Sequence, residues 1–461
     1  MSSSVRLDSL VRYFALVLTA GVLLWASGEP ARAAGVIEVV DSAGDVGYSS
    51  SLVLDAGGNP VVSYVDAHGN LRLLHCGDPQ CGAGNSIAVV EIDAEQHEET
   101  SLALAAGGNP VISYQSYSGP RLTIVRCGNP ACTQGNTSVS PAPAIVNGGD
   151  SSLVLDASGY PVVSYHDALY DEVEVLHCGN ATCTAGNTTA TLDEAIPASA
   201  GTSLALDASG NPAVAYFDDS SGDVKVVRCG DASCTAGNTV AVIDDAGFNG
   251  GSVSLALDGG IPVLAYHDDE TAGPDYLKVV RCGNAACTSG NTLATPDEAG
   301  SDTSIALDAS GNPVVSYRVL SSGELRVLVC GNASCTSGNS TVSPGGADSG
   351  IGTSLALDKK GNPVVSYRAL TALAVGELRV LHCSLQDCST PKPPSGDVNC
   401  NGRVDSIDAA LVLQSAAGLI DQLPCNVGFK DDPDCNGRVN AIDAALILQY
   451  IAGLLDRLPV C

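Results

Sequence analysis

Short apolar runs alternate with polar turns along most of the chain, and they recur with a fixed period. The clearest copy runs from Ser203 to Asp245 and holds four such runs, SLALD, PAVAY, VKVVRC and NTVAVID, separated by Gly, Asn and Ser. Runs of this length, rich in Val, Leu and Tyr and bounded by turn residues, predict β-strands. Copies spaced by 50 or 51 residues begin at Ser51, Ser101, Ser152, Ser203, Ser254, Ser304 and Ser354. A fixed period in this range indicates a repeat architecture.

Four strands in each of seven copies predict an all-β, seven-bladed β-propeller, which repeats a four-stranded sheet around a central axis. A β-solenoid is the alternative. The seventh copy stops at Cys388 after three runs, whereas Gly35–Gly44 at the other end of the chain matches the fourth run at Thr239–Gly247. A ring needs this exchange, because the N-terminal strand can then complete the last blade without leaving an open edge. We expect residues 35–388 to form the propeller, with SLALD as the inner strand of each blade and the exchanged strand outermost.

Residues 1–33 have the pattern of a secretion signal. Arg6 and Arg12 precede an apolar run from Tyr13 to Ala26, and Ala31-Arg32-Ala33 forms a small-residue cleavage site. A signal anchor is the alternative, but the run is short for a bilayer span. The chain's one tryptophan lies inside this segment.

Each copy also carries two cysteines in the spacing C-x4-C. Zinc would need two such pairs to converge, which separate blades prevent. An iron–sulfur cluster would need a further cysteine two residues on. In an exported chain we expect a local disulfide at each turn between the third and fourth runs. The predicted pairs are Cys76–Cys81, Cys127–Cys132, Cys178–Cys183, Cys229–Cys234, Cys282–Cys287, Cys330–Cys335 and Cys383–Cys388.

Charge narrows the range of partners. The 461 residues include 51 acidic and 21 basic side chains, which give a formal net charge of −30. Such a balance argues against nucleic acid or anionic lipid as the partner. No segment after the signal is apolar enough over sufficient length to span a membrane.

Repetition separates structural from functional candidates within the propeller. A tyrosine ends the second run of all seven copies, which favours packing between blades over ligand binding. The residues that follow it vary, and they define what we call the rim set. A ligand or metal site is one interpretation of this set; a solvated rim with local ion pairs is the favoured one. The rim set comprises Asp66, His166, Asp167, Asp218, His267, Asp268, Arg318 and Arg368.

Two acidic loops near the C-terminus, Asp397–Asp408 and Asp432–Asp443, have the spacing of Ca²⁺ loops. Oxygen-bearing side chains stand at positions 1, 3, 5, 9 and 12, position 7 offers its carbonyl, and glycine at position 6 permits the sharp turn. The first loop would use Asp397, Asn399, Asn401, the Arg403 carbonyl, Asp405 and Asp408. The second would use Asp432, Asp434, Asn436, the Arg438 carbonyl, Asn440 and Asp443.

The duplicated loop–helix unit resembles the type I dockerins over Gly396–Cys461, through its paired loops, an AALxLQ helix after each loop, and Gly-Leu at each helix end. The resemblance implies a small helical domain over residues 397–461 that binds two Ca²⁺ ions and docks into a cohesin. It also implies cohesin contacts at Ser406, Ile407, Ala441 and Ile442. The Ser/Thr pair of well-known cellulosomal members is absent, so their partner specificity does not carry over. Asparagine in place of Asp at loop position 5 should weaken calcium binding without abolishing it.

Within this dockerin-like unit, Ile407, Ala410 and Leu411 are expected to share one apolar helix face, as are their counterparts 35 residues on. We expect the two helices to pack antiparallel, since neither can bury its face alone. Of three possible connectivities, we then favour Cys400–Cys461 with Cys425–Cys435, because pairing within a repeat would span a helix about 18 Å long. Pro391, Pro393 and Pro394 mark residues 389–396 as an extended linker.

These features predict a secreted, non-catalytic propeller that its dockerin anchors to a cohesin-bearing scaffold or cell surface. The resemblance implies a setting of polysaccharide degradation or surface assembly. Two alternatives remain open: a propeller-fold glycoside hydrolase or lyase, and a module that binds carbohydrate or protein at its rim. Hydrolysis needs two carboxylates across a pocket, and no pair is singled out. The mature chain would also lack tryptophan to stack on sugar.

Overall fold

The structure, a computed structural model, describes two compact units, Ala34–Ser389 and a second that contains Thr390–Cys461. The described residues are 35–92, 100–116, 121–141, 151–167, 169–194, 201–245, 253–268, 276–298, 300–344, 349–388, 398, 404, 406–420, 440–452, 454–455 and 458. The N-terminal signal and the linker predicted from the sequence lie outside them.

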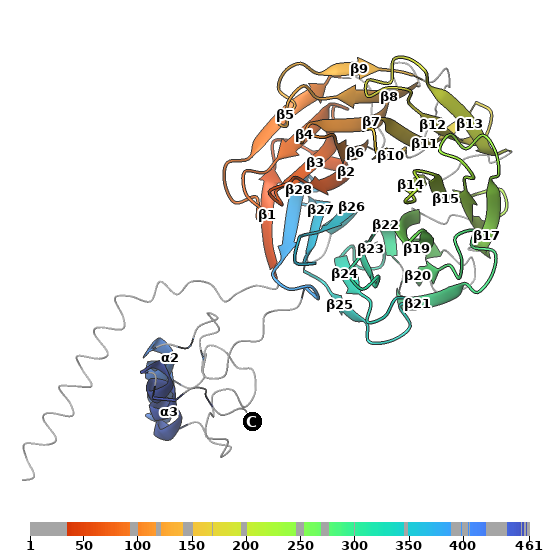
Figure 1. Cartoon of the computed structure of the whole chain (residues 1–461). Helices are drawn as coiled ribbons and strands as arrows, with labels where there is room; N and C mark the ends of the chain where they lie inside the picture. The colour runs from red at the N-terminus through yellow and green to blue at the C-terminus, as the bar shows by residue number, and fades with distance from the viewer. Residues whose placement is uncertain are drawn as a thin grey trace, which may run out of the picture. The chain divides into compact units, whose positions relative to one another are not determined.

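The first unit is a ring of seven four-stranded antiparallel sheets (Figure 1). Six blades use four consecutive strands, and the first strand of each lies innermost. Blade 1 has β2 (Val46–Leu54), β3 (Pro60–Asp66), β4 (Leu71–His75) and β5 (Ser86–Glu91); blade 2 has β6 (Thr100–Leu104), β7 (Pro110–Ser116), β8 (Arg121–Arg126) and β9 (Thr137–Val139); blade 3 has β10 (Ser152–Leu155), β11 (Pro161–Asp167), β12 (Glu172–His177) and β13 (Thr188–Asp193). Blade 4 has β14 (Thr202–Leu206), β15 (Pro212–Asp218), β16 (Asp223–Arg228) and β17 (Thr239–Asp245); blade 5 has β18 (Val253–Asp258), β19 (Ile261–Asp268), β20 (Tyr276–Arg281) and β21 (Thr292–Glu298); blade 6 has β22 (Gly300–Leu307), β23 (Pro313–Val319), β24 (Leu325–Val329) and β25 (Ser340–Val342).

Blade 7 closes the ring with a strand from the other end of the chain. It consists of β26 (Ser349–Leu357), β27 (Pro363–Leu370), β28 (Gly376–Cys383) and β1 (Gly35–Asp41). Strand β1 pairs antiparallel with β28, from Gly35 opposite Cys383 to Val39 opposite Arg379. The predicted strand exchange is therefore confirmed, and the solenoid alternative is excluded.

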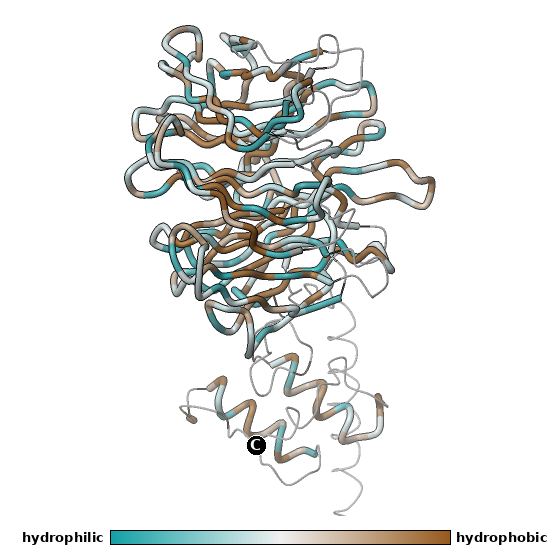
Figure 2. Tube along the Cα trace, turned by 90° about the vertical axis from the view of Figure 1, so that its right-hand side faces the viewer, coloured by the Kyte–Doolittle hydropathy of each residue, from teal (hydrophilic) through white to brown (hydrophobic). Residues whose placement is uncertain are grey.

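The apolar core lies between neighbouring blades. The second strands are buried along nearly their whole length where their side chains are described, because both faces of each are covered by an adjacent blade. Figure 2 shows the apolar segments running through the middle of the sheets, with polar segments in the turns. One such cluster joins Val111 and Ile124 of blade 2 to Val163 and Tyr165 of blade 3.

Serine in the first strand has a structural role that repeats around the ring. The hydroxyl of the first Ser in SLALD accepts a hydrogen bond from a backbone N–H of the next blade's inner strand. This satisfies a donor that the innermost strand edge would otherwise leave open. The bonds are Leu102 N to Ser51 (3.1 Å), Leu153 N to Ser101 (2.9 Å), Leu204 N to Ser152 (3.0 Å), Leu255 N to Ser203 (3.0 Å), Ile305 N to Ser254 (3.0 Å), Leu355 N to Ser304 (3.0 Å) and Leu52 N to Ser354 (2.9 Å).

A second hydroxyl contact joins the inner strand of one blade to the second strand of the blade before it. The Oγ–Oγ pairs are Thr100 with Ser63 (2.7 Å), Ser151 with Ser113 (2.8 Å), Thr202 with Ser164 (2.7 Å), Thr353 with Ser316 (2.9 Å) and Ser50 with Ser366 (2.9 Å). At the junction of blades 4 and 5 the two positions are Ala215 and Val253, which lie in one apolar cluster. Both partners are apolar there, so neither leaves a buried hydroxyl unpaired.

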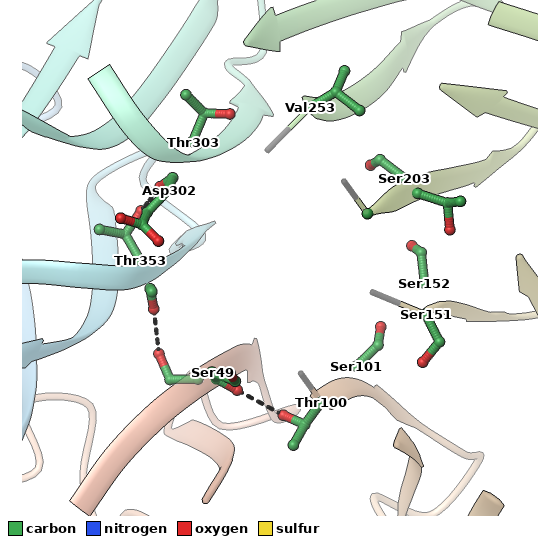
Figure 3. Close-up of a pocket in the computed structure, with 14 residues that line it drawn as sticks. Ser49, Thr100, Ser101, Ser151, Ser152, Ser203, Val253, Asp302, Thr303 and Thr353 are labelled. Carbon is green, nitrogen blue, oxygen red and sulfur yellow. Dashed lines mark hydrogen bonds between the residues drawn. The ribbon is translucent and has the colours of Figure 1, made fainter. Parts of the chain in front are cut away.

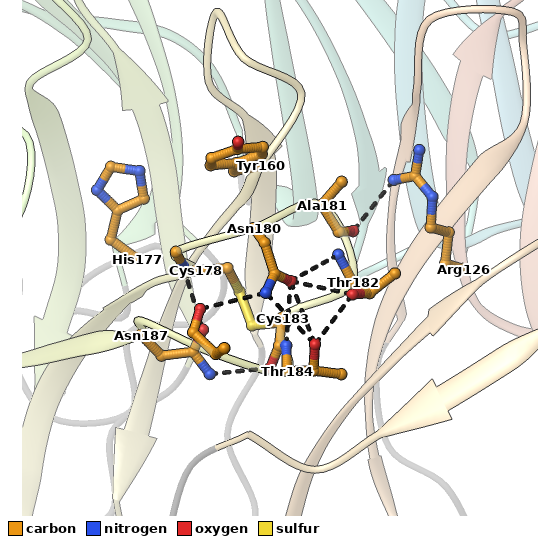
Figure 4. Close-up of a disulfide and its surroundings, with 12 residues drawn as sticks. Arg126, Tyr160, His177, Cys178, Asn180, Ala181, Thr182, Cys183, Thr184 and Asn187 are labelled. Carbon is orange, nitrogen blue, oxygen red and sulfur yellow. Dashed lines mark hydrogen bonds between the residues drawn. A yellow bond between two sulfur atoms is a disulfide. The ribbon is translucent and has the colours of Figure 1, made fainter.

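All seven C-x4-C pairs form disulfides, as predicted, with Cα atoms 4.8 to 5.0 Å apart. In blade 3 the Asn187 side chain accepts from Gly179 N (3.1 Å) and donates to Cys183 O (2.8 Å), which braces the turn (Figure 4). Only glycine fits at 179, because a Cβ there would lie 2.3 Å from Gly186 O. The tail cysteines Cys400, Cys425, Cys435 and Cys461 lie outside the described residues.

In the second unit, α2 (Ser406–Ala416) contacts α3 (Ala441–Ile451). The expected apolar faces are wrong at Ile407 and Ile442, which are 49% and 58% exposed, whereas Leu411 and Leu446 pack against the core as expected. The core lies one to two residues further along each helix, where alanine lets the two backbones approach. It is formed by Val398, Ala409, Val412, Ala444, Ile447 and Leu458.

Candidate functional site

The last residue of each predicted calcium loop is a fully buried carboxylate. Asp408 accepts a hydrogen bond from Val398 N (3.0 Å), and Asp443 accepts one from Asn440 N (2.7 Å). The Asn440 side chain accepts in turn from Ile442 N (2.8 Å), so the two side chains cap the first turn of α3 reciprocally. The other nine predicted ligands lie outside the described residues.

The donor set fits a hard cation. It contains only carboxylate, amide and carbonyl oxygens, which Ca²⁺ prefers. Burying a carboxylate completely is costly unless hydrogen bonds and a positive charge offset the loss of water. Asp408 and Asp443 would therefore be held by backbone N–H groups on one side and by the cation on the other.

The predicted cohesin contacts are all exposed at the start of the two helices: Ser406, Ile407, Ala441 and Ile442. The sequence interpretation missed a second exposed pair, Leu413 and Leu448, at 44% and 45%. These two leucines stand at equivalent places in the repeat, 35 residues apart. The sequence could have indicated them, because each repeat has more apolar residues at equivalent positions than one buried helix face can hold.

The acidic members of the rim set are buried, and in three blades a cation from the adjacent strand neutralises them. Lys225 Nζ lies 2.7 Å from Asp218 and 3.0 Å from Asp193 of the preceding blade. Arg72 joins Asp66 and Asp41 in the same way, and Lys278 joins Asp268 and Asp244. Burial alone would raise the pKa of Asp218, but hydrogen bonds from Lys225 and Ser220 outweigh it and lower the pKa to about 2.

The tyrosine in the second strand of a blade can add a hydrogen bond to these ion pairs across the blade boundary. Tyr216 OH donates to Asp193 Oδ2 (2.5 Å) and Tyr64 OH donates to Asp41 Oδ2 (2.7 Å), each acid belonging to the preceding blade. Burial, and then the accepting carboxylate, raises the pKa of both hydroxyls. The expected role of these tyrosines in packing between blades is confirmed by this burial and bonding.

Arg368, one of the two arginines of the rim set, faces the following blade. Arg368 of blade 7 donates to Asp45 Oδ1 (2.6 Å) and Tyr48 OH (3.0 Å), and its guanidinium lies 4.1 Å from the Tyr48 ring centroid. These contacts hold the closing junction between blades 7 and 1.

Burial and Asp218 raise the pKa of Asp219, and His166 of blade 3 lowers it in part.

The sequence favoured a solvated rim with local ion pairs; the solvation is wrong for these side chains, whereas the ion pairs are present at Asp66, Asp218, Asp268 and Arg368. Seven of the eight are at most 7% exposed: Asp66, His166, Asp167, Asp218, His267, Asp268 and Arg368. Arg318 is half-buried. The rim set thus lies between blades instead of forming one open cluster.

A pocket of about 150 Å³ opens at the axis of the ring, where inner strands from all seven blades contribute to its lining (Figure 3). Its walls are hydroxyls and backbone, with Asp302 the one acid among the lining residues. Many of these hydroxyls already bond between blades; Thr100 Oγ1, for example, also donates to Ser49 O (2.9 Å). The polarity of the pocket therefore follows from the way the blades are joined.

Comparison with known proteins gives a different result for each of the two units. Residues 395–452 match the family model described as "Dockerin type I domain". The C-terminal segment is a type I dockerin domain. Dockerins of this type bind calcium. A solved complex of the third cohesin ScaC with a mutated ScaB dockerin from Acetivibrio cellulolyticus is 38% identical over 15% of this chain and 94% of that chain, with a TM-score of 0.14.

The propeller resembles solved structures only distantly. A protein of unknown function from Dyadobacter fermentans is 13% identical over 77% of this chain and 100% of its own, with a TM-score of 0.47. The BP39L lectin from Burkholderia pseudomallei is 11% identical over 72% and 95%, with a TM-score of 0.49. No curated protein matches the chain. Within the described part of the chain, no helix combines the length and hydropathy that crossing a bilayer requires.

Proposed function

We propose that this is an exported, non-catalytic propeller carried by its dockerin to a cohesin-bearing scaffold or cell surface, in polysaccharide degradation or surface assembly. The observation that carries the proposal is the dockerin match over residues 395–452, which includes both acidic loops. The exposed, repeated pairs Ile407/Ile442 and Leu413/Leu448 support it, because they offer apolar side chains to a partner.

Two calcium ions would stabilise the dockerin, one in each loop. The first would be held by Asp397, Asn399, Asn401, Arg403 O, Asp405 and Asp408, and the second by Asp432, Asp434, Asn436, Arg438 O, Asn440 and Asp443. The burial of Asp408 and Asp443 beside backbone donors supports this assignment. Calcium would offset the repulsion among the carboxylates of each loop and so couple metal binding to folding.

Export is supported by the pattern of residues 1–33 and by seven disulfides, which persist in oxidising compartments. A non-catalytic role for the propeller is supported by the state of the rim acids. Asp66, Asp218 and Asp268 each pair with a cation of their own blade, which leaves them poorly suited to proton transfer.

The test is a pull-down with the mature protein from spent culture medium, in calcium and in chelator. We expect a cohesin-containing protein to be captured in calcium and released by chelator. Capture of the same partner with and without chelator would contradict calcium-dependent docking. Release of reducing sugar from polysaccharides by the isolated protein would contradict the non-catalytic role.

A further inference from the structure

Blade 3 departs from the charge pattern of blades 4 and 5. In blades 4 and 5 the residue paired across the strand with the repeat tyrosine is a lysine, Lys225 or Lys278. In blade 3 the residue opposite Tyr165 is Glu174. Blade 3 therefore has an acid at the position where blades 4 and 5 have the lysine that neutralises a buried aspartate.

The reversal leaves an uncompensated negative site. Asp167, at 1% exposure, lies beside Glu174 and Glu172, and no cation of the described residues acts on Glu174. Burial raises the pKa of Glu174, and the charges of Asp167 and Glu172 raise it further, against a lowering by the Tyr165 hydroxyl. Like charges this close are destabilising unless a cation or a proton joins them.

A second, independent feature points into the same site. The Tyr165 hydroxyl is fully buried and lies beside Glu174, but it makes no hydrogen bond of good geometry there. Its counterpart Tyr216 bonds to an aspartate that a lysine also holds. Blade 3 thus keeps the tyrosine and the buried acid of the pattern and lacks the lysine.

The turn between β11 and β12, next to these acids in the chain, carries an exposed aromatic ring. Tyr170, in the turn between β11 and β12, is 65% exposed, and Leu169 beside it is 53% exposed. Within the described propeller residues, Tyr170 is the one strongly exposed aromatic side chain. A tyrosine face attracts ammonium groups and covers an aliphatic stem.

We propose that blade 3 binds the side chain of a lysine from a partner protein. The ammonium group would pair with Asp167 and Glu174, as the chain's own lysines lie 2.6 to 3.0 Å from two carboxylates in blades 4 and 5. Tyr170 would pack on the lysine stem. A metal ion fits less well, because no three acidic, histidine or cysteine side chains of the described residues converge closely enough to share one.

The test titrates the intact secreted protein, in calcium and physiological salt, with acetylated tetralysine by calorimetry. Glu174→Lys restores the cation of blades 4 and 5 and should weaken binding at least about fivefold, as expected when a close charge pair is replaced by a repelling one. Tyr170→Ala should weaken it about two- to threefold through loss of the cation–π contact. Glu298→Lys on exposed blade 5 surface makes the same charge change and should alter affinity less than about twofold, because separated surface charges are screened.

Equal weakening by Glu174→Lys and Glu298→Lys would overturn the proposal, since it would show nonspecific attraction to the chain's net charge of −30. Tighter binding of a glucosamine tetramer than of tetralysine, with the same loss on Glu174→Lys, would overturn the assignment to lysine. Should Glu174→Lys not fold, Glu174→Gln tests the same loss of charge. Cohesin capture measured on the Glu174 variants should be unchanged, so failure of this site and failure of docking give different results.

Discussion

At the scale of single residues, Glu174 is a half-buried acid whose pKa is raised by burial and by the neighbouring acids Asp167 and Glu172. An acid with a raised folded-state pKa stabilises the fold below its unfolded pKa, about 4.3, and loses that contribution as pH rises through the folded pKa. Glu174→Gln removes this loss. We expect the variant to melt higher than the parent at pH 7 and at the same temperature at pH 3.5, in calorimetric scans across that range.

The exposed Glu298 supplies the control for this measurement. Glu298→Gln should leave the melting temperature unchanged at both pH values. Parallel pH curves for the parent and the Glu174→Gln protein would show that Glu174 carries no uncompensated charge.

The Ala215–Val253 contact predicts a non-additive pair of substitutions. Ala215→Ser alone buries a hydroxyl opposite a valine and should cost about 1–3 kcal/mol. Adding Val253→Thr rebuilds the bond seen between Ser164 and Thr202 (2.7 Å), so the double variant should recover most of that loss. Urea unfolding of the parent, both single variants and the double variant measures the coupling, and a coupling near zero would contradict the hydroxyl pairing.

At the scale of elements, the pairing of β1 with β28 inside blade 7 is not all that closes the ring. Side-chain contacts also join blade 7 to blade 1. Arg368 joins Asp45 and Tyr48 across this junction, whereas Arg318, at the same place in blade 6, forms no ion pair with any other described residue. Arg368→Leu should lower propeller stability by about 1–2 kcal/mol, the cost of leaving a partly buried carboxylate unpaired.

Arg318→Leu is the matched control, and thermal melting in calcium is the measurement. It should lower the melting temperature by less than Arg368→Leu does. Equal effects from the two substitutions would mean that the Arg368 contacts add nothing to closure of the ring.

The strands could be predicted from the sequence because each repeat shows the same apolar runs separated by turn residues. The exchange of Gly35–Asp41 into blade 7 followed from counting runs at the two ends. The burial of the rim set could not be predicted, since His166 and Asp218 reach the space between blades only once the ring has closed. The helix faces were misjudged for a related reason: Ala409 and Ala444 are core residues because small side chains let α2 and α3 approach.

At the scale of the whole molecule, the two units should unfold independently. Asp408→Ala with Asp443→Ala removes both buried carboxylates of the dockerin, which we expect to abolish its calcium-dependent transition. The propeller transition should not move, because seven disulfides and its own interblade clusters hold it. Differential scanning calorimetry checks this, and a lowered propeller transition in the double variant would contradict separate units.

The central claim is that calcium shapes a dockerin surface that binds cohesin through its repeated exposed apolar residues. The most direct measurement is a calorimetric titration of type I cohesins into the intact secreted protein, with and without calcium, for the parent and for Ile407→Asp with Ile442→Asp. We predict saturable binding to at least one cohesin in calcium, lost in chelator and weakened at least about tenfold in the double variant. Binding that survives both the chelator and the double substitution would contradict the account.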